Sequence, residues 1–223
     1  MREERRTDNR AASGINNRDR KAKGDLAIMG VSSASGGLYG KVKITGEGDV
    51  DGDLECTEFR CTGNANVRGG MTARSVKLTG NATVSGKVTA EKLVLQGQAD
   101  IGGDCEAETC YLKGAVSVDG LMNAEEMTIV MYGPCRAKEI GGGKIKIRLR
   151  GGVSFTKLFK PAYRARLTAE SIEGDDVYVE HTTATIVRGN RVTVGPGCEI
   201  EAVEYKTGFR QANGTVVKRQ EKI

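Results

Sequence analysis

The sequence predicts an all-β fold, a parallel β-helix (β-solenoid) with coils of about 17 residues. Three observations predict it: residues 43–127 divide into five rows of seventeen without a gap, two columns of these rows are always glycine, and six further columns are apolar or small. A fixed internal period of this kind dictates the architecture of a chain. The glycine columns, fourth and tenth, hold Gly46, Gly63, Gly80, Gly97 and Gly114, and Gly52, Gly69, Gly86, Gly103 and Gly120.

The apolar columns are spaced as in strands rather than helices. They fall at positions 2, 6, 8, 12, 14 and 17 of the row, and pairs two apart place side chains on one face of a strand. We therefore expect three short strands per coil, glycines near the corners, and coils stacked at about 4.8 Å. The predicted core columns are the eighth and the second, with Val50, Val67, Val84, Ile101 and Val118, and Leu78, Leu95 and Leu112.

The composition agrees with a narrow interior. There is no Trp, and only four Phe and six Tyr occur in 223 residues, whereas Gly occurs 31 times. The six cysteines invite a disulfide or zinc interpretation. Four of them, however, replace apolar residues in inward columns, so we expect buried free thiols and a reducing compartment. They are Cys56, Cys61, Cys105, Cys110, Cys135 and Cys198.

The chain is expected to begin with an arm and a first coil. Residues 1–24 hold eight Lys or Arg and four Asp or Glu, which is +4 of the total formal charge of +5, and almost no apolar residue. Such a segment cannot bury enough surface to order itself. We expect a disordered arm, either solubilising or attracted to an anionic partner. The β-helix is expected over residues 25–142, with an imperfect coil first.

The repeat is expected to shorten after Met127. Thr128–Ile140 matches the preceding row when four residues are removed before Gly133, which places Cys135 and Ile140 in columns 12 and 17. This alignment predicts a gap in the solenoid that another segment has to cover.

Residues 143–166 are predicted to be a basic insertion covering that gap. Residues 141–169 contain eight Lys or Arg and no acidic residue. One interpretation is a packed insertion with solvated charges, another is a membrane-surface patch with apolar side chains in the interface, and a third is a nucleic-acid patch. The candidate membrane or partner patch is Lys144, Lys146, Arg148, Arg150, Phe155, Lys157, Leu158, Phe159, Lys160, Arg164 and Arg166.

Coils are expected to resume over residues 167–205, followed by a polar, frayed tail over 206–223. Nothing in the sequence favours catalysis. His181 is the single histidine, and no P-loop, G-x-S-x-G or dinucleotide fingerprint is present. We expect no cofactor, no metal and no small-molecule substrate. The acidic residues between Glu170 and Glu180 lack the spacing of calcium-binding β-rolls and are expected to be solvated, or to meet the basic insertion.

The rows resemble the bactofilin family of bacterial polymer-forming cytoskeletal proteins, and in particular its longer members from Gram-positive spore-formers. The resemblance is carried by KLTGNATVSG (77–86), ECTEFRCTG (55–63), SIEGDDVYVE (171–180), VRGNRVTVGPGCEI (187–200) and VEY (203–205). It implies a right-handed β-helix that polymerises without nucleotide, often at the membrane, and supports shape, envelope or flagellar processes. The interruption and basic insertion depart from the shorter members.

The open ends of a solenoid favour the same conclusion independently, because an unpaired strand edge is a template for another chain. We therefore expect a self-assembling scaffold whose partners are itself, by end-to-end stacking, a paralogous bactofilin and an anionic membrane surface; nucleic acid is disfavoured. No apolar run of spanning length and no secretory signal is visible, so a cytoplasmic or inner-membrane-peripheral location is expected. The alternatives are a membrane-docked adaptor that does not polymerise, and a β-helix acyltransferase or polysaccharide-acting enzyme.

Overall fold

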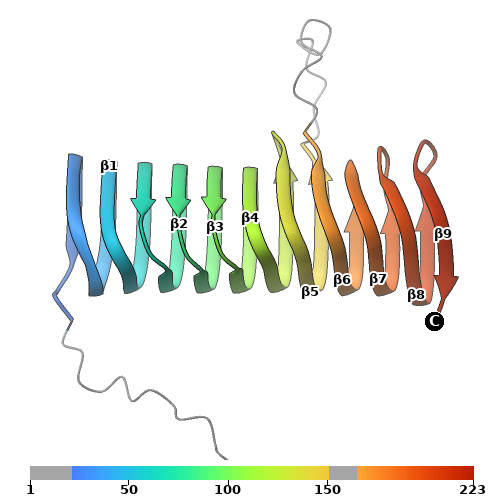
Figure 1. Ribbon diagram of the computed structural model, residues 1–223, viewed down its shortest axis with the longest axis horizontal. Coiled ribbons are helices and arrows are strands. Elements are labelled where there is room, and N and C mark those ends of the chain that lie inside the picture. The colour runs from blue at the N-terminus through green and yellow to red at the C-terminus, as the bar shows by residue number, and fades with distance from the viewer. Residues whose placement is uncertain (1–21, 151–164) are drawn as a thin grey trace, which may run out of the picture.

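The computed structural model describes residues 22–150 and 165–223. These residues form one nine-stranded sheet in chain order, in which every pair of neighbours is parallel and no helix occurs among the described residues (Figure 1). The predicted parallel β-solenoid is therefore confirmed. The strands are β1 (Leu26–Val67), β2 (Met71–Val84), β3 (Val88–Ile101), β4 (Cys105–Met131), β5 (Cys135–Leu149), β6 (Leu167–Val179), β7 (Thr182–Val194), β8 (Glu199–Gln211) and β9 (Val216–Lys222).

The 17-residue period of the sequence is the spacing between residues that pair in successive coils. Leu78 of β2 pairs with Cys61 of β1 and with Leu95 of β3, each seventeen residues away. Leu95 in turn pairs with Leu112 of β4. Within a coil the three expected short segments run together as one bent strand, which spans 14 residues in β2 and in β3. Equivalent residues therefore stack in columns along the axis of the molecule.

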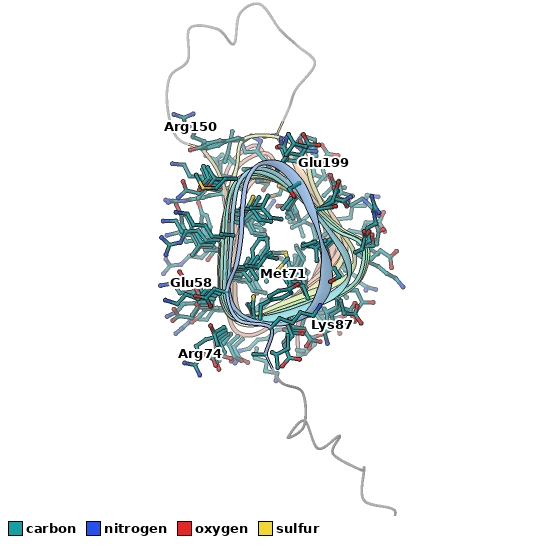
Figure 2. All side chains as sticks on the ribbon, turned by 90° about the vertical axis from the view of Figure 1, so that its left-hand side faces the viewer. Glu58, Met71, Arg74, Lys87, Arg150 and Glu199 are labelled. Atoms are coloured by element: carbon teal, nitrogen blue, oxygen red, sulfur yellow. The ribbon has the colours of Figure 1, made fainter. Side chains whose placement is uncertain are left out.

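The core is the inside of this stack. All eight residues of the two predicted core columns are buried, with exposed fractions from 0 to 5 %. Viewed along the axis, Met71 points into the interior, whereas Glu58, Arg74, Lys87 and Glu199 lie around the outside (Figure 2). The alternation of buried and exposed residues along each strand produces this arrangement. Because each coil holds so few inward side chains, its burial depends on the coils above and below.

The fourth-column glycines allow the coils to approach each other at one corner. Gly80 has φ +127° and pairs in register with Gly63 and Gly97. A Cβ atom added to Gly80 would lie 2.1 Å from the carbonyl oxygen of Gly63. No side chain fits in that space, so this column is glycine for two reasons, the left-handed backbone and the contact with the preceding coil.

The predicted shortening after Met127 is wrong. Ile140 stacks on Met122 and Ile145 stacks on Met127, which is a register of eighteen residues rather than thirteen. Because Arg136 pairs with Ser117, Cys135 lies six positions earlier in the coil than expected. The residues around Gly133 form a bend that enlarges one corner. The register then shifts by one residue, because Ala137 pairs with Val118 but Ile140 pairs with Met122. The alignment failed because it assigned Gly133 to a glycine column.

The solenoid also extends further than the predicted segments. Residues 144–149 belong to β5, where Ile145 and Ile147 are buried, so these residues are part of the wall rather than of an insertion. Ile140 pairs with Ile172, which lies 32 residues further along the chain. Fourteen of these residues, 151–164, are outside the described part, so the described part of this coil has eighteen residues. Residues 206–223, expected to fray, contain the end of β8 and all of β9, which pairs with β8.

The glycine column yields a prediction on stability. Gly80→Ala should lower the free energy of unfolding by about 3 kcal/mol or more, because the new Cβ meets backbone that cannot move independently. Gly52→Ala is the control: Gly52 also has positive φ, +99°, but a Cβ there has nothing within 4 Å. It should cost only the conformational strain, about 1–2 kcal/mol. Urea unfolding of both variants followed by circular dichroism measures the difference, and equal losses would contradict the role assigned to stacking.

Candidate interaction surfaces

Strand β5 carries the described core of the predicted basic patch. Lys144, Lys146 and Arg148 alternate with buried residues and are exposed on one wall of the solenoid. The ammonium nitrogen of Lys144 lies 3.7 Å from a carboxylate oxygen of Glu126, a loose surface pair. Lys146 makes no side-chain hydrogen bond or ion pair with any residue that the structure describes. The alternation therefore directs three cations away from the core and side by side.

Two other members of the predicted patch have structural contacts. The guanidinium of Arg150 lies over the ring of Tyr132, 4.6 Å from its centre, and Lys113 lies 5.6 Å from the same ring. Arg166 donates to Thr183 Oγ1 at 2.6 Å and pairs with Glu199 at 3.1 Å. It is thus held against the coils above it, away from Lys144 and Lys146. Phe155, Lys157, Leu158, Phe159, Lys160 and Arg164 lie outside the described residues.

A carboxylate contacts the backbone at the C-terminal end of β5. Glu180 Oε2 accepts a hydrogen bond from the backbone N–H of Leu149 at 2.9 Å, and Glu180 Oε1 accepts one from the hydroxyl of Tyr178 at 2.5 Å. The bond to Glu180, burial and the charge of Glu180 together raise the pKa of Tyr178 to about 12. The sequence gives no sign of this role, because Glu180 appears there only as one of several acidic residues.

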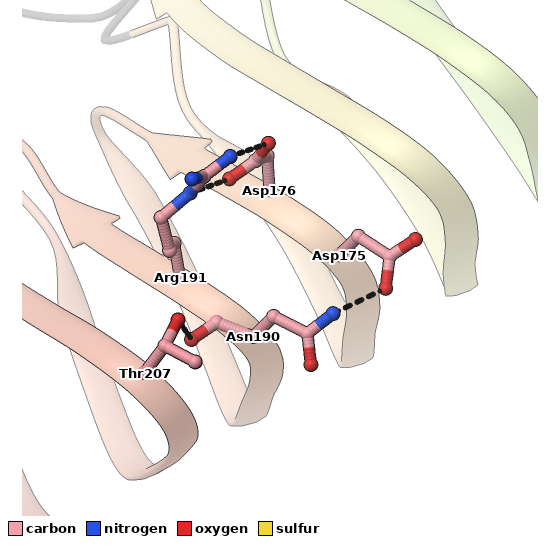
Figure 3. Close-up of polar contacts among 5 residues, drawn as sticks. All are labelled: Asp175, Asp176, Asn190, Arg191 and Thr207. Atoms are coloured by element: carbon pink, nitrogen blue, oxygen red, sulfur yellow. Dashed lines mark hydrogen bonds and ion pairs between the residues drawn. The ribbon is translucent and has the colours of Figure 1, made fainter.

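Two neighbouring acidic residues, Asp175 and Asp176, also have partners, in contacts that link successive coils (Figure 3). Asn190 donates to Asp175 at 2.7 Å, and Thr207 donates to the backbone oxygen of Asn190 at 2.9 Å. Arg191 forms two bonds with Asp176, and these bonds hold the pKa of that carboxyl below its usual value. Within residues 22–150 and 165–223 no group of three or more His, Cys, Asp or Glu is arranged to hold a metal ion. Asp175 and Asp176 therefore connect their coil to the next one.

The cysteines and the histidine are placed as structural residues. All six thiols are free and buried. Burial raises the pKa of Cys56, Cys61 and Cys135 to about 11 and that of Cys105 to about 12, so none is poised as a nucleophile. His181 has φ +46°, and its backbone N–H donates to the carbonyl of Pro196 at 2.9 Å. It forms a corner of the coil between β6 and β7.

The two ends of the solenoid differ from each other. At the N-terminal end, Lys23 donates from its backbone to Leu38 and from its ammonium to the carbonyl of Gly36, both at 2.8 Å. The outward residues of the first coil include Met29 and Val31, which are 82 % and 80 % exposed. At the C-terminal end, β9 covers part of β8, and Tyr205 stacks on Phe209 with ring centres 5.4 Å apart.

The exposed pair at the N-terminal end was missed in the sequence. Met29 and Val31 flank Gly30, which has φ +83° and lies against Gly46, so Gly30 is a further member of the fourth glycine column. Extending the rows to Gly30 with an offset of sixteen would have placed both side chains outward.

Among the described residues, the first and last strands of the elongated solenoid each pair with a neighbour on one side. The sequence profile of the family described as "Bactofilin: Polymer-forming cytoskeletal" matches residues 16–106. Residues 16–106 of this chain are therefore similar to the bactofilin family, which is described as polymer-forming and cytoskeletal. The described residues include no helix long and apolar enough to cross a membrane.

Two proteins of Bacillus subtilis are similar to this chain. YhbE is 39 % identical over 90 residues, which is 40 % of this chain and 37 % of YhbE. YhbF is 37 % identical over 87 residues, which is 39 % of this chain and 34 % of YhbF. The chain therefore spans about a third of the length of the curated relatives that it matches. Comparison with solved structures found no match.

The environment of Tyr178 yields a prediction on alkaline pH. Its pKa is higher in the folded than in the unfolded chain, so its contribution to stability is present below pH 10 and is lost as the pH rises towards 12. The difference in tyrosinate absorbance between wild type and Tyr178→Phe should titrate near pH 12. Glu180→Ala should move that titration towards the ordinary phenol value, near 10. A titration of Tyr178 near pH 10 in the intact chain would remove the assigned hydrogen bond.

The cysteines yield a prediction on reactivity. Native protein at pH 8 should react with essentially none of its thiols when an aromatic disulfide reagent is added, because the thiolate is both buried and disfavoured. The same protein in guanidinium chloride should titrate six thiols. Rapid reaction of one or more thiols before unfolding would contradict the buried placement.

Proposed function

We propose that this chain is the subunit of a nucleotide-independent polymer that grows by end-to-end stacking of solenoids. The observation that carries the proposal is the single parallel ladder from β1 to β9, whose first and last coils each have a neighbour on one side only. A second copy placed on such an edge would continue both the backbone ladder and the stacked core columns. A paralogous bactofilin with the same coil would fit the same edge.

We further propose that the polymer lies at the inner face of the membrane and supports cell shape, envelope or flagellar processes. The exposed cations of β5 support a membrane location, because lysine and arginine near an anionic bilayer each contribute about 1 kcal/mol of attraction. The competing proposal, a membrane-docked adaptor that stays monomeric or dimeric, shares this surface and differs in assembly alone.

Assembly is tested by sedimentation and negative-stain electron microscopy of the purified protein at physiological salt without nucleotide. Wild type should pellet and form elongated polymers. Met29→Lys with Val31→Lys should shift most of the protein to the supernatant, because two new charges on the first coil repel the adjoining copy. Thr72→Lys with Thr83→Lys adds the same charge at exposed sites in the middle of the solenoid and should still pellet.

A small soluble species for wild type would overturn the polymer proposal and leave the adaptor. Polymers that are equally insensitive to both pairs of substitutions would place the contact elsewhere than the N-terminal coil.

A further inference from the structure

We propose that one entire wall of the solenoid, rather than the region around residues 151–164 alone, is a docking face for an anionic lipid bilayer. This inference rests on the proposed function, because it assigns the surface by which the polymer contacts the membrane. The wall is the left-hand side in Figure 2, between the positions of Glu58 and Arg150, where nitrogen-tipped side chains project in rows. We call it the basic wall.

The basic wall is made by the outward residues of two columns, the first and the third. The register runs from Arg60 to Lys77 and through Val94 to Tyr111 in the first column. It continues from Thr128 to Lys146 and through Tyr178 and Thr193 to Arg210. The two columns contain seven cations and one anion, Glu180. The cations are Lys43, Arg60, Lys77, Lys113, Lys146, Arg148 and Arg210.

The cations of the basic wall are largely unneutralised. The ammonium groups of Lys43, Lys77 and Lys146 make no hydrogen bond or ion pair with any residue in the described part of the chain. Arg60 pairs with Glu58 at 2.6 Å, and the cation of Lys113 rests over the ring of Tyr132. The stacking places successive cations about 4.8 Å apart where they are adjacent, so the wall carries a concentrated positive field.

Several acidic side chains on the other walls already have partners within the chain, so a second copy would offer these carboxylates only by losing those contacts. Asp51 pairs with Arg68 at 2.5 Å, and Glu201 pairs with Lys218 at 3.1 Å. Asp53 and Asp104 accept backbone N–H groups of the next coil, from Gly70 at 2.7 Å and Leu121 at 2.9 Å. Lateral pairing of copies through these four carboxylates would have to break their contacts, whereas lipid phosphates bring anions from outside.

The shape of the wall fits a bilayer better than a nucleic acid. The wall is straight in cross-section and runs along the whole solenoid (Figures 1 and 2), so it can lie flat on a planar surface. Its middle carries Val94 and Tyr111, the latter 38 % exposed, and aromatic side chains favour the headgroup region of membranes. A depression of about 850 Å³ lies on the same wall, and its lining holds five cations, among them Lys146, Arg148 and Arg210, and three carboxylates, Glu126, Asp176 and Glu180.

Assembly would convert this wall into a multivalent surface. A single copy held by exposed charges alone binds weakly and is screened by salt. End-to-end stacking places the basic walls of successive copies in register, so that each copy binds at the high local lipid concentration that its neighbours establish. Membrane binding is then strong for the polymer and weak for the subunit.

The proposal is tested by flotation with vesicles of phosphatidylserine and phosphatidylcholine, compared with phosphatidylcholine alone. The wall variant is Lys43→Glu with Lys77→Glu, in the N-terminal half and outside β5. Its control is Lys87→Glu with Lys138→Glu, two exposed cations on other walls with the same change in net charge. The wall variant should bind phosphatidylserine vesicles at least about tenfold more weakly than wild type, and the control should bind as wild type does.

Lipid-free sedimentation of the same proteins separates this proposal from the polymer itself. Retained pelleting with lost flotation supports the basic wall, whereas loss of pelleting in wild type counts against the polymer proposal. Lys43→Gln with Lys77→Gln repeats the test should the reversal variant fail to fold. Equal flotation of wall and control variants would overturn the proposal. So would wild type that ignores phosphatidylserine vesicles and binds double-stranded DNA of the same total charge.

Discussion

Contact between the backbones of successive coils is the constraint on which the rest of this molecule depends. At the fourth column the carbonyl oxygen of one glycine occupies the space that a Cβ of the next would need, as between Gly63 and Gly80. This contact keeps one corner of the coil in register over Gly46, Gly63, Gly80, Gly97 and Gly114. Once that corner is fixed, the period of two along the strand decides which side chains enter the core.

The same constraint makes the molecule one-dimensional. Each coil buries its few inward side chains only against its neighbours, so changes in one coil are absorbed locally. The chain shows this twice. The bend around Gly133 adds residues to one corner, and residues 151–164 separate β5 from β6. Strand β5 nevertheless pairs with β4, with one shift of register, and with β6. Side chains then satisfy backbone groups at the ends of these strands, as the Glu180 carboxylate does for the backbone N–H of Leu149.

The fold could be predicted from the regular rows, because a gapless repeat states the register directly. The period, the parallel stacking and the inward columns through Met127 were all available from the spacing of Gly, Val and Leu. Where the spacing changes, sequence reasoning failed. A glycine that makes a bend, Gly133, is indistinguishable in sequence from one in a column. The basic residues of KIKIRLR (144–150) favoured an insertion, although its isoleucines alternate with them as in a strand of the wall and are buried. Contacts such as Tyr178 with Glu180 join residues two apart, and spacing alone does not reveal them.

The distribution of charge follows from the same geometry and links the fold to function. In a stacked solenoid the outward residues of one column form a straight line along the axis. Residues of like charge in the same column of successive rows therefore lie next to each other on the surface. Acidic residues at columns beside the corners bond to the next coil, as Asp53 does to Gly70 and Asp104 does to Leu121. Their charge is therefore used within the molecule.

Lysines in the first column, such as Lys43 and Lys77, lie on a straight wall with no such corner to contact. Their charge remains available to a partner, and a polymer of the chain would repeat it indefinitely in one direction. A sequence that is nearly neutral in its body can in this way present one strongly basic side, because the repeat sorts acids and bases onto different walls.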